Sequence, residues 1–327
     1  MNILAIRRRT LITAGAAAAC FLTAQASAQS YPSRPVKLVA ANPPGGLTDT
    51  VSRMLSPRLQ AALGQPVVID NKPGANGVVA ASSLASSLPD GYAFIVADGS
   101  MLTVNPLIFS KLAYDAKKDF VPVSLVGQAP LFLAVNPRLG VNSLDELIAL
   151  AKKRPGALNY GSSGLGSTHH LTMEAMKGRL GIFLTHIPFK GSAASVPALL
   201  AGDVDMVFSA YPSVAGLVKT GQVRLLAVNS GKRWSQEPNV PALAEKIPGF
   251  DFAPNIIMIA KAGTPAEAIE RMSMEIARIA KQPEAIELMR TAGVSLIGGS
   301  PADLAAALQK ESVQMIQAVR QANLKPE

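Results

Sequence analysis

Short apolar runs alternate with segments of helical spacing along most of this chain, and this alternation constrains the fold more than any other feature. Several runs are rich in Val and Ile, which is typical of buried strands. Strands that alternate with helices favour an α/β fold, in which helices cover both faces of mostly parallel sheets. The runs that predict strands are VKLVAA, PVVID, AFIVAD, LFLAVN, LNYGS, THIPF, VDMVFS, RLLAVNS and NIIMIA.

The segments between these runs predict amphipathic helices. In the clearest one, which begins at Val51, apolar side chains recur with helical spacing and share one face. A second helix is bounded by a capping box, Ser143 with Glu146, and by a terminating Pro-Gly pair at residues 155–156. Further helices are predicted at residues 193–201, 265–280 and 301–321.

The N-terminus has the three parts of an export signal. Arginines occupy residues 7–9, an apolar stretch covers residues 11–22, and residues 26–28 form an A-x-A cleavage signal. The apolar stretch is shorter than the ~20 residues that a membrane span needs. This pattern predicts secretion rather than membrane anchoring.

We therefore expect residues 1–28 to be a signal peptide that is cleaved near Ala28, so that a mature protein beginning near Gln29 enters the periplasm. Cys20, the only cysteine, is removed with this peptide, and no thiol then remains for a disulfide, a metal or catalysis. The general and the twin-arginine export routes both stay open. A lipoprotein site at Cys20 is a weaker alternative.

The mature chain of 299 residues (327 − 28) is long enough for one large or two medium domains with buried cores. Its net charge is +6, because the +9 of the full chain includes the three arginines of the signal peptide. The positive charges form no cluster and aromatic residues make up only 5% of the chain, which disfavours a nucleic-acid partner. A mild attraction for small anions fits this charge.

The stretch NPPGGLTD, residues 42–49, lies between a predicted strand and a predicted helix. Its prolines stiffen the chain, whereas Gly45 and Gly46 admit positive φ and have no Cβ to obstruct a group that approaches the backbone. Thr48 or Asp49 then caps the helix, whose free N–H groups and dipole favour a carboxylate or another oxyanion. A tight turn without a ligand is the alternative interpretation.

A second glycine-rich loop, GSSGLGST at residues 161–168, precedes a helix in the second half of the chain. It matches a P-loop except that Ser167 replaces the lysine, which disfavours nucleotide hydrolysis. Its hydroxyl and backbone donors suit a small neutral or singly charged anionic group, and a Ser/Gly turn without a ligand is again the alternative.

The serines and histidines of this second loop raise two further possibilities, a serine hydrolase and a zinc site. A serine hydrolase would use Ser162 or Ser163 with His169 as the base, although the Gly-x-Ser-x-Gly elbow is incomplete. A zinc site is disfavoured, because His169 and His170 are adjacent and their side chains diverge on a helix.

Polar residues also occupy the carboxyl ends of other predicted strands, where open α/β sheets bind ligands. Residues 98–100, Asp-Gly-Ser, follow the run AFIVAD, and Phe208 and Ser209 lie at the end of VDMVFS. Asp203 and Asp205 flank the start of that strand, and we assign Asp203 to a turn cap.

Eight motifs occur in order along the mature chain: YPSRPVKLV, PPGGLTD, LGQPVVIDNKPGANG, PDGY, LNYGSSGLGSTHHL, PFKGSAASVPALLAGDVDMVF, RLLAVNS and AGTP. In this combination the chain resembles the tripartite tricarboxylate transporter substrate-binding proteins, the Bug family of bacterial periplasmic receptors. Each motif alone is weak, but their serial combination covers essentially the whole mature chain and is specific.

The resemblance implies a type II periplasmic binding protein with two lobes that close on a small organic carboxylate. One lobe would comprise residues 31–127 plus 253–327, and the other residues 128–252. The expected partners are the membrane subunits of a tripartite transporter or a sensor. We expect a monomer that has no enzymatic activity, cofactor or metal, and the resemblance does not identify the carboxylate.

In this family, backbone amides and ordered waters of two loops grip a ligand carboxylate. Asn42 stands where the family commonly has an aromatic residue, so we expect a polar contact there. The implied ligand-binding residues of the two loops are Pro44, Gly45, Gly46, Thr48, Asp49, Ser162, Ser163, Gly164, Ser167, Thr168 and His169. The expected site is completed by Ser100, Asp205, Phe208 and Ser209.

Overall fold

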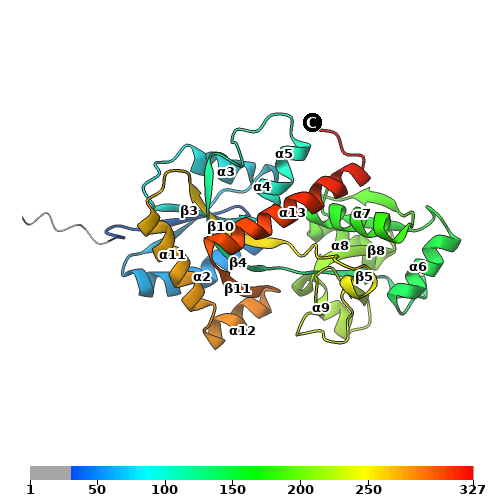
Figure 1. Cartoon of the computed structure of the whole chain (residues 1–327). Helices are drawn as coiled ribbons and strands as arrows, with labels where there is room; N and C mark the ends of the chain where they lie inside the picture. The colour runs from blue at the N-terminus through cyan, green and yellow to red at the C-terminus, as the bar shows by residue number, and fades with distance from the viewer. Residues whose placement is uncertain (1–30, 327) are drawn as a thin grey trace, which may run out of the picture.

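The computed structural model describes residues 31–326 of the 327-residue chain, and the predicted signal peptide lies outside these residues. The chain forms two halves, each built around its own β-sheet with helices packed against it (Figure 1). This arrangement confirms the predicted α/β fold.

The first half contains a six-stranded sheet made of β1 (Val36–Ala40), β2 (Val67–Asn71), β3 (Ala93–Asp98), β4 (Phe120–Gln128), β10 (Asn255–Lys261) and β11 (Ser295–Gly299). Their order across the sheet is β11-β4-β10-β3-β1-β2. β1 pairs in parallel with β2 and β3, whereas β10 runs antiparallel to β3 and β4, and β11 runs antiparallel to β4.

The second half contains a five-stranded sheet made of β5 (Leu131–Val135), β6 (Asn159–Ser162), β7 (Thr185–Pro188), β8 (Met206–Ala210) and β9 (Arg224–Val228). Their order is β7-β6-β8-β5-β9. β6 pairs in parallel with β7 and β8, and β5 runs antiparallel to β8 and β9.

Both sheets contain antiparallel pairs but keep one predominant strand direction, as predicted: β1, β2, β3 and β4 run the same way in the first sheet, and β6, β7, β8 and β9 in the second. The antiparallel pairs all involve β5, β10 or β11, and the chain enters β5 and β10 after it has crossed from the other half. The direction of these two strands therefore follows from the crossover, which local sequence does not encode. The sequence pattern also does not predict β4, which contains Pro122, or β11, which ends in two glycines; both residue types weaken a strand signal.

Helices cover both faces of the first sheet. The core on one face surrounds Leu38 and includes side chains of α2 (Leu47–Leu63), α11 (Ala266–Ile279) and α12 (Pro283–Thr291). The core on the other face surrounds Ile95 and includes α3 (Val78–Ala85) and α4 (Ser100–Thr103). The short elements η1 (Ala75–Gly77) and α5 (Asn105–Ile108) complete this half.

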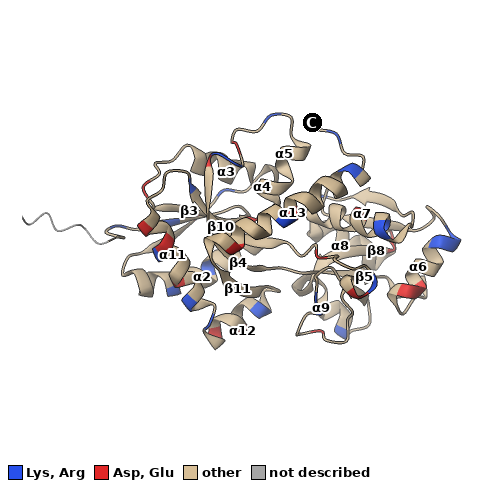
Figure 2. Ribbon diagram, viewed as in Figure 1, with Lys and Arg blue, Asp and Glu red and all other residues tan. Residues whose placement is uncertain are grey.

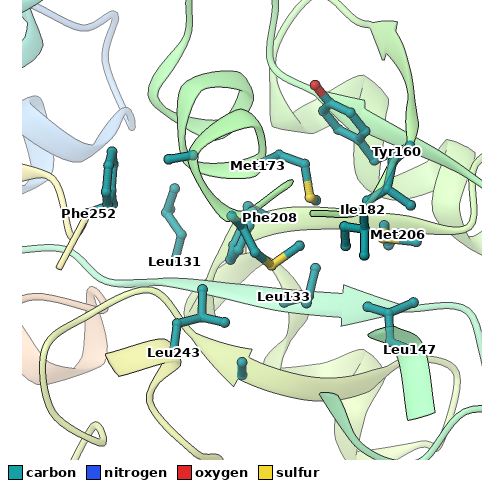
Figure 3. Packing of buried hydrophobic residues seen from close by; sticks show 14 of the residues in the cluster. Leu131, Leu133, Leu147, Tyr160, Met173, Ile182, Met206, Phe208, Leu243 and Phe252 are labelled. Atoms are coloured by element: carbon teal, nitrogen blue, oxygen red, sulfur yellow. The ribbon is translucent and has the colours of Figure 1, made fainter. Parts of the chain in front are cut away.

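The second sheet is covered in the same way. The larger core contains Phe208 and Tyr160 and is closed by α6 (Leu144–Lys153), α7 (Thr168–Leu180) and α10 (Leu243–Lys246), as Figure 3 shows for part of the cluster. The opposite face carries α8 (Ser192–Ala201) and α9 (Tyr211–Lys219), and η2 (Pro137–Leu139) follows β5. Within residues 31–326, no helix has the length and the apolar character that crossing a membrane requires.

The last helix, α13 (Pro301–Gln321), connects the two halves (Figure 1). Its first turn places Leu304 in a core of the first half, and its later turns place Met315 and Ala318 in the core of the second half. Because one helix contributes to both cores, the relative position of the two halves depends on α13 as well as on the two crossover segments.

Candidate functional site

The loop of residues 42–49 connects the carboxyl end of β1 to α2 and is held by a clasp between its two ends. The Asn42 N–H donates to the Thr48 hydroxyl at 3.0 Å, and the Asn42 side-chain oxygen accepts from the Thr48 N–H at 3.1 Å and from the Thr48 hydroxyl at 3.0 Å. The Thr48 hydroxyl thus both donates and accepts within the loop, so its contribution is to shape the loop.

The Asp49 carboxylate also holds this loop in place, through hydrogen bonds. Its side chain is only 1% exposed and accepts hydrogen bonds from the Gly45 N–H at 2.8 Å, the Asn71 amide at 2.8 Å and the Arg53 guanidinium at 2.9 Å. The Arg53 hydrogen bond, helped by those from Gly45 and Asn71, lowers the pKa of Asp49 from 3.8 to about 2. Asp49 is therefore an ionised internal clamp of the loop, and its expected contact with a ligand stays a prediction.

The structure requires glycine at positions 45 and 46 for different reasons. Gly45 has φ +83°, and a Cβ added there would meet no atom within 4 Å. Gly46 has φ −73°, but an added Cβ would lie 2.6 Å from the Asn42 Cβ. The clasp itself therefore requires glycine at position 46, and the expectation that Gly46 keeps a path open for a ligand stays a prediction.

Two backbone donors at the start of α2 remain unused. The N–H groups of Gly46 and Thr48 are bonded to Pro43 and Asn42, whereas those of Leu47 and Asp49 form no hydrogen bond within residues 31–326. Pro44 precedes these donors in the turn. Free N–H groups at a helix N-terminus attract anions, because they combine hydrogen-bond donors with the positive end of the helix dipole.

The loop of residues 162–169 connects the carboxyl end of β6 to α7. Ser167 caps the helix by accepting from the His170 N–H at 3.3 Å, and its hydroxyl donates to the Gly164 carbonyl at 2.7 Å. The Ser162 hydroxyl also contacts Gly164, accepting from its N–H at 3.2 Å. These bonds leave the Thr168 hydroxyl and the N–H groups of Thr168 and His169 without a hydrogen-bond partner in the described chain.

A stack of rings supports this loop from the core side. His170 stacks on His186 with 3.9 Å between ring centroids, and His186 stacks on Tyr160 at 4.8 Å. One ring nitrogen of each histidine contacts the loop. His186 Nε2 lies 2.7 Å from the Ser162 hydroxyl, and His170 Nδ1 accepts from the Gly166 N–H at 3.1 Å. Burial lowers the pKa of His170 to about 3, so the stack carries no charge on this ring at neutral pH.

His169 points away from this stack, as the sequence analysis expected for adjacent histidines. Its two ring nitrogens lie 2.8 Å from the Ser163 hydroxyl and 3.3 Å from the Ser192 hydroxyl. Burial lowers its pKa to about 4. No carboxylate of the described residues orients His169 as the third member of a triad would, and both nitrogens already contact hydroxyls, so the ring is a fixed support for the loop. No group of three or more potential metal ligands occurs in residues 31–326.

The remaining predicted residues lie at different ends of the strands. Ser100 begins α4 beside the first loop, and Ser209 lies at the carboxyl end of β8, fully buried and with an unpartnered hydroxyl. Asp205 precedes β8 and accepts from the Asn159 N–H at the start of the neighbouring strand β6, away from the carboxyl end, and Phe208 lies in the core at 1% exposure. Both side chains are therefore engaged within the protein, and the expected ligand contacts of Asp205 and Phe208 stay predictions.

Sequence reasoning missed a third loop of the site. Residues 73–77 follow β2, and all of them except Ala75 line a cavity of about 130 Å³ at the first loop, together with Asn42, Thr48 and Asp98. The signal was available, because KPGANG follows a predicted strand as NPPGGLTD does and has the same Pro/Gly composition.

A second cavity, of about 80 Å³, lies where the halves meet. It is lined by Thr168 of the second loop, by both crossover segments and by α13. At its base the Glu311 carboxylate accepts from the Thr103 hydroxyl at 2.7 Å and the Asn255 amide at 2.6 Å. Burial, with repulsion from Asp98, raises the pKa of Glu311 from 4.5 to about 7.

The raised pKa of Glu311 predicts a pH-dependent stability. Between pH 4.5 and about 7 the folded protein binds more protons at this group than the unfolded chain, so the contribution of Glu311 to the free energy of unfolding falls as the pH rises. As the pH rises across this window, the free energy of unfolding of Glu311→Gln should therefore increase relative to that of the wild-type protein by up to about 3 kcal/mol.

Urea unfolding of both proteins at pH 5 and pH 8 measures this gain, and the opposing titration of the histidines cancels in the difference. A difference that is independent of pH would show that Glu311 titrates normally.

These features define a class of protein: two α/β lobes joined by two crossover segments, with a donor-rich helix N-terminus at a strand end in each lobe, as in type II periplasmic binding proteins. Residues 51–324 match the family model described as the tripartite tricarboxylate transporter family receptor. The chain is 36% identical over 282 residues to protein BugT of Bordetella pertussis, covering 86% of each chain.

Two solved structures are also similar. R. palustris Rpa4515 with adipate has a TM-score of 0.80 and 34% identity over 91% of this chain and 100% of that chain. MatC from Rhodopseudomonas palustris with bound malate has a TM-score of 0.74 and 28% identity over 88% of this chain and 100% of that chain. The chain therefore belongs to the tripartite tricarboxylate transporter receptors, the Bug family, and is a periplasmic solute-binding receptor, not an enzyme; the serine hydrolase alternative is not supported.

Proposed function

We propose that this receptor binds a small organic carboxylate between the loop of residues 42–49 and the loop of residues 162–169. The observation that carries the proposal is the set of unused donors at two helix N-termini: the N–H groups of Leu47 and Asp49 in one lobe, and those of Thr168 and His169 in the other. Two helix dipoles and four N–H groups stabilise an oxyanion without any chemical step.

The known ligands of two relatives support a carboxylate. Adipate is bound to Rpa4515 and malate to MatC, and both are small organic acids. No Lys or Arg lines the cavity at the first loop, and the positions of basic residues are dispersed along the ribbon of both halves (Figure 2). Affinity for an anion would therefore come from backbone and hydroxyl donors that closure of the lobes removes from water.

The lobes of this proposal are residues 31–127 plus 253–327 and residues 128–252. The strands of the first sheet fall in residues 36–128 and 255–299 and those of the second in residues 131–228, which supports the division. We further propose a monomer that delivers its ligand to the membrane subunits of a tripartite transporter or to a sensor.

The proposal includes export with cleavage of the signal peptide near Ala28. The N-terminal sequence of protein recovered from the periplasm should begin at or near Gln29, and an intact N-terminus would contradict cleavage there.

A screen of small mono- and dicarboxylates by thermal unfolding tests the central proposal. A cognate acid at about 100 times its Kd should raise the free energy of unfolding by about 2.7 kcal/mol. With that acid, Thr168→Ala should weaken binding by about 1 to 3 kcal/mol, because a polar group of the bound ligand would lose its hydroxyl partner. The stability of the unliganded protein should change little, since the hydroxyl has no partner within residues 31–326.

Thr220→Ala is the matched control, because this exposed hydroxyl bonds only at the end of α9 and should not affect affinity. Titration calorimetry of the three proteins measures the effect. Equal affinity in all three would place the carboxylate away from the second loop.

A further inference from the structure

The cavity at the first loop contains an acid that has no basic neighbour. Asp98, at the carboxyl end of β3, lines this cavity together with Asn42, Thr48 and the loop of residues 73–77. No Lys or Arg is part of the lining, and none of the ion pairs in residues 31–326 includes Asp98. The one cation close to the loop, Arg53, is paired with Asp49 on the far side of the clasp.

The surroundings of Asp98 make this acid unusual. One carboxylate oxygen accepts from the Ser100 N–H at 2.8 Å, and the nearby carboxylate is that of Glu311, which is buried on α13. Burial raises the pKa of Asp98, and the two acids repel one another. An acid placed in a cavity beside a second acid lowers the affinity of that cavity for an anion, so its position calls for a partner that can donate to it.

A second acceptor lies in the same lining. The Asn76 amide donates to the Asn105 side-chain oxygen at 2.7 Å, and the Asn105 amide donates back to the Asn76 carbonyl at 3.0 Å. This exchange fixes the loop of residues 73–77 and leaves the side-chain oxygen of Asn76, an exposed residue, without a hydrogen-bond partner in the described chain. The lining of the cavity therefore offers two oxygen acceptors, from Asp98 and Asn76, and it also includes Thr48 in the first turn of α2.

We infer that the ligand carries an amino group in addition to its carboxylate, and that Asp98 receives this ammonium in the cavity lined by residues 73–77. The inference rests on the proposed function, because the carboxylate is the part held by the helix N-termini. A zwitterion places its negative end on the α2 donors, which flank Thr48 of the lining, and its positive end on Asp98. A second carboxylate in the same position would face the Asp98 carboxylate and be repelled.

Pairs of small acids that differ only in one amino group test this inference. The probes are glutamate with glutarate, aspartate with succinate, and 4-aminobutanoate with butanoate. They are titrated calorimetrically at pH 7.5 into the wild-type protein, Asp98→Asn and Asp70→Asn. The first variant keeps an acceptor for the Ser100 N–H, and the second is a matched control, because Asp70 is a partly exposed residue of β2 that pairs with Lys37 and does not line the cavity.

In at least one pair, the amino acid should bind the wild-type protein about tenfold or more tightly than the plain acid, which corresponds to about 1.4 kcal/mol or more. Asp98→Asn should remove this preference, and its affinity for the plain acid should stay equal or rise. Asp70→Asn should retain the wild-type preference.

The outcomes separate this inference from the proposed function. Plain acids that bind the wild-type protein as tightly as their amino partners would overturn the ammonium and leave the carboxylate site intact. If neither these probes nor any acid of the wider screen binds, both proposals fail. If Asp98→Asn does not fold, the wild-type ratios alone decide the question, since a ratio near one in every pair excludes an ammonium contact.

Discussion

Replacing Phe208 by alanine should lower the free energy of unfolding by about 3 to 5 kcal/mol. The side chain is 1% exposed and lies among apolar residues of the larger core of the second lobe, where Figure 3 places it close to Met173 and Leu131. Truncation removes its buried area and leaves a cavity that strands on both sides cannot collapse to fill. Urea denaturation monitored by circular dichroism measures the loss.

Phe183→Ala is the matched control, because this phenylalanine is 61% exposed and should cost much less. Phe208→Leu keeps most of the core volume and should retain ligand affinity while losing a smaller part of the stability. A variant Phe208→Leu that folds stably but binds no cognate acid would support the predicted ligand contact of Phe208.

The second large effect should come from Asp49→Ala. This change removes the acceptor of three hydrogen bonds and leaves the Gly45 N–H and the Asn71 amide without it. We expect the free energy of unfolding to fall by about 2 to 4 kcal/mol, because three hydrogen bonds to a buried charged acceptor are lost. Affinity for a cognate acid should fall by about 100-fold or more, since the loop no longer holds the α2 donors in place.

Asp70→Ala provides the comparison for Asp49→Ala. Its carboxylate is 34% exposed and forms only long ion pairs, at 3.7 and 3.9 Å, so its removal should cost less than about 1 kcal/mol. Thermal unfolding and calorimetry of both variants measure stability and affinity separately. Normal affinity in a folded Asp49→Ala protein would show that the first loop does not depend on its internal clamp.

The Asp49 contribution also has a defined pH range. Its pKa is lowered from 3.8 to about 2 in the folded protein, so the stabilisation is fully present above pH 4 and is lost as the pH falls through about 2. Glu311 acts in the opposite direction, because its raised pKa destabilises the folded protein as the pH rises toward 7.

The two proposed ligand loops reach similar geometry by different means. In the first lobe, Asn42, Thr48 and Asp49 satisfy one another and Asn71, so the side chains shape the loop and only backbone N–H groups are left free. In the second lobe, rings that stack in the core fix Ser162 and Gly166, which leaves the Thr168 hydroxyl available. This difference explains why Thr168→Ala should affect binding alone and Asp49→Ala should affect both binding and stability.

The sequence by itself determined the features that depend on local chemistry. Apolar periodicity predicts the α/β fold and nine of its strands, and the Pro/Gly composition of residues 42–49 and 161–168 predicts loops at strand ends that present helix N-termini. These predictions hold because φ preferences, capping and face periodicity act between residues that are close in the chain.

Only the tertiary structure decided which polar groups are free and which are used. Asp49 and Thr168 are similar candidates in sequence, but Asp49 meets Asn71 from β2, 22 residues away, whereas Thr168 meets no partner in the described chain. Glu311 bonds Thr103 across 208 residues, and Asp98 shares a cavity with a loop of another strand. Partners at such separations are set by sheet order and crossover direction, and the burial that shifts a pKa exists only after the lobes have packed.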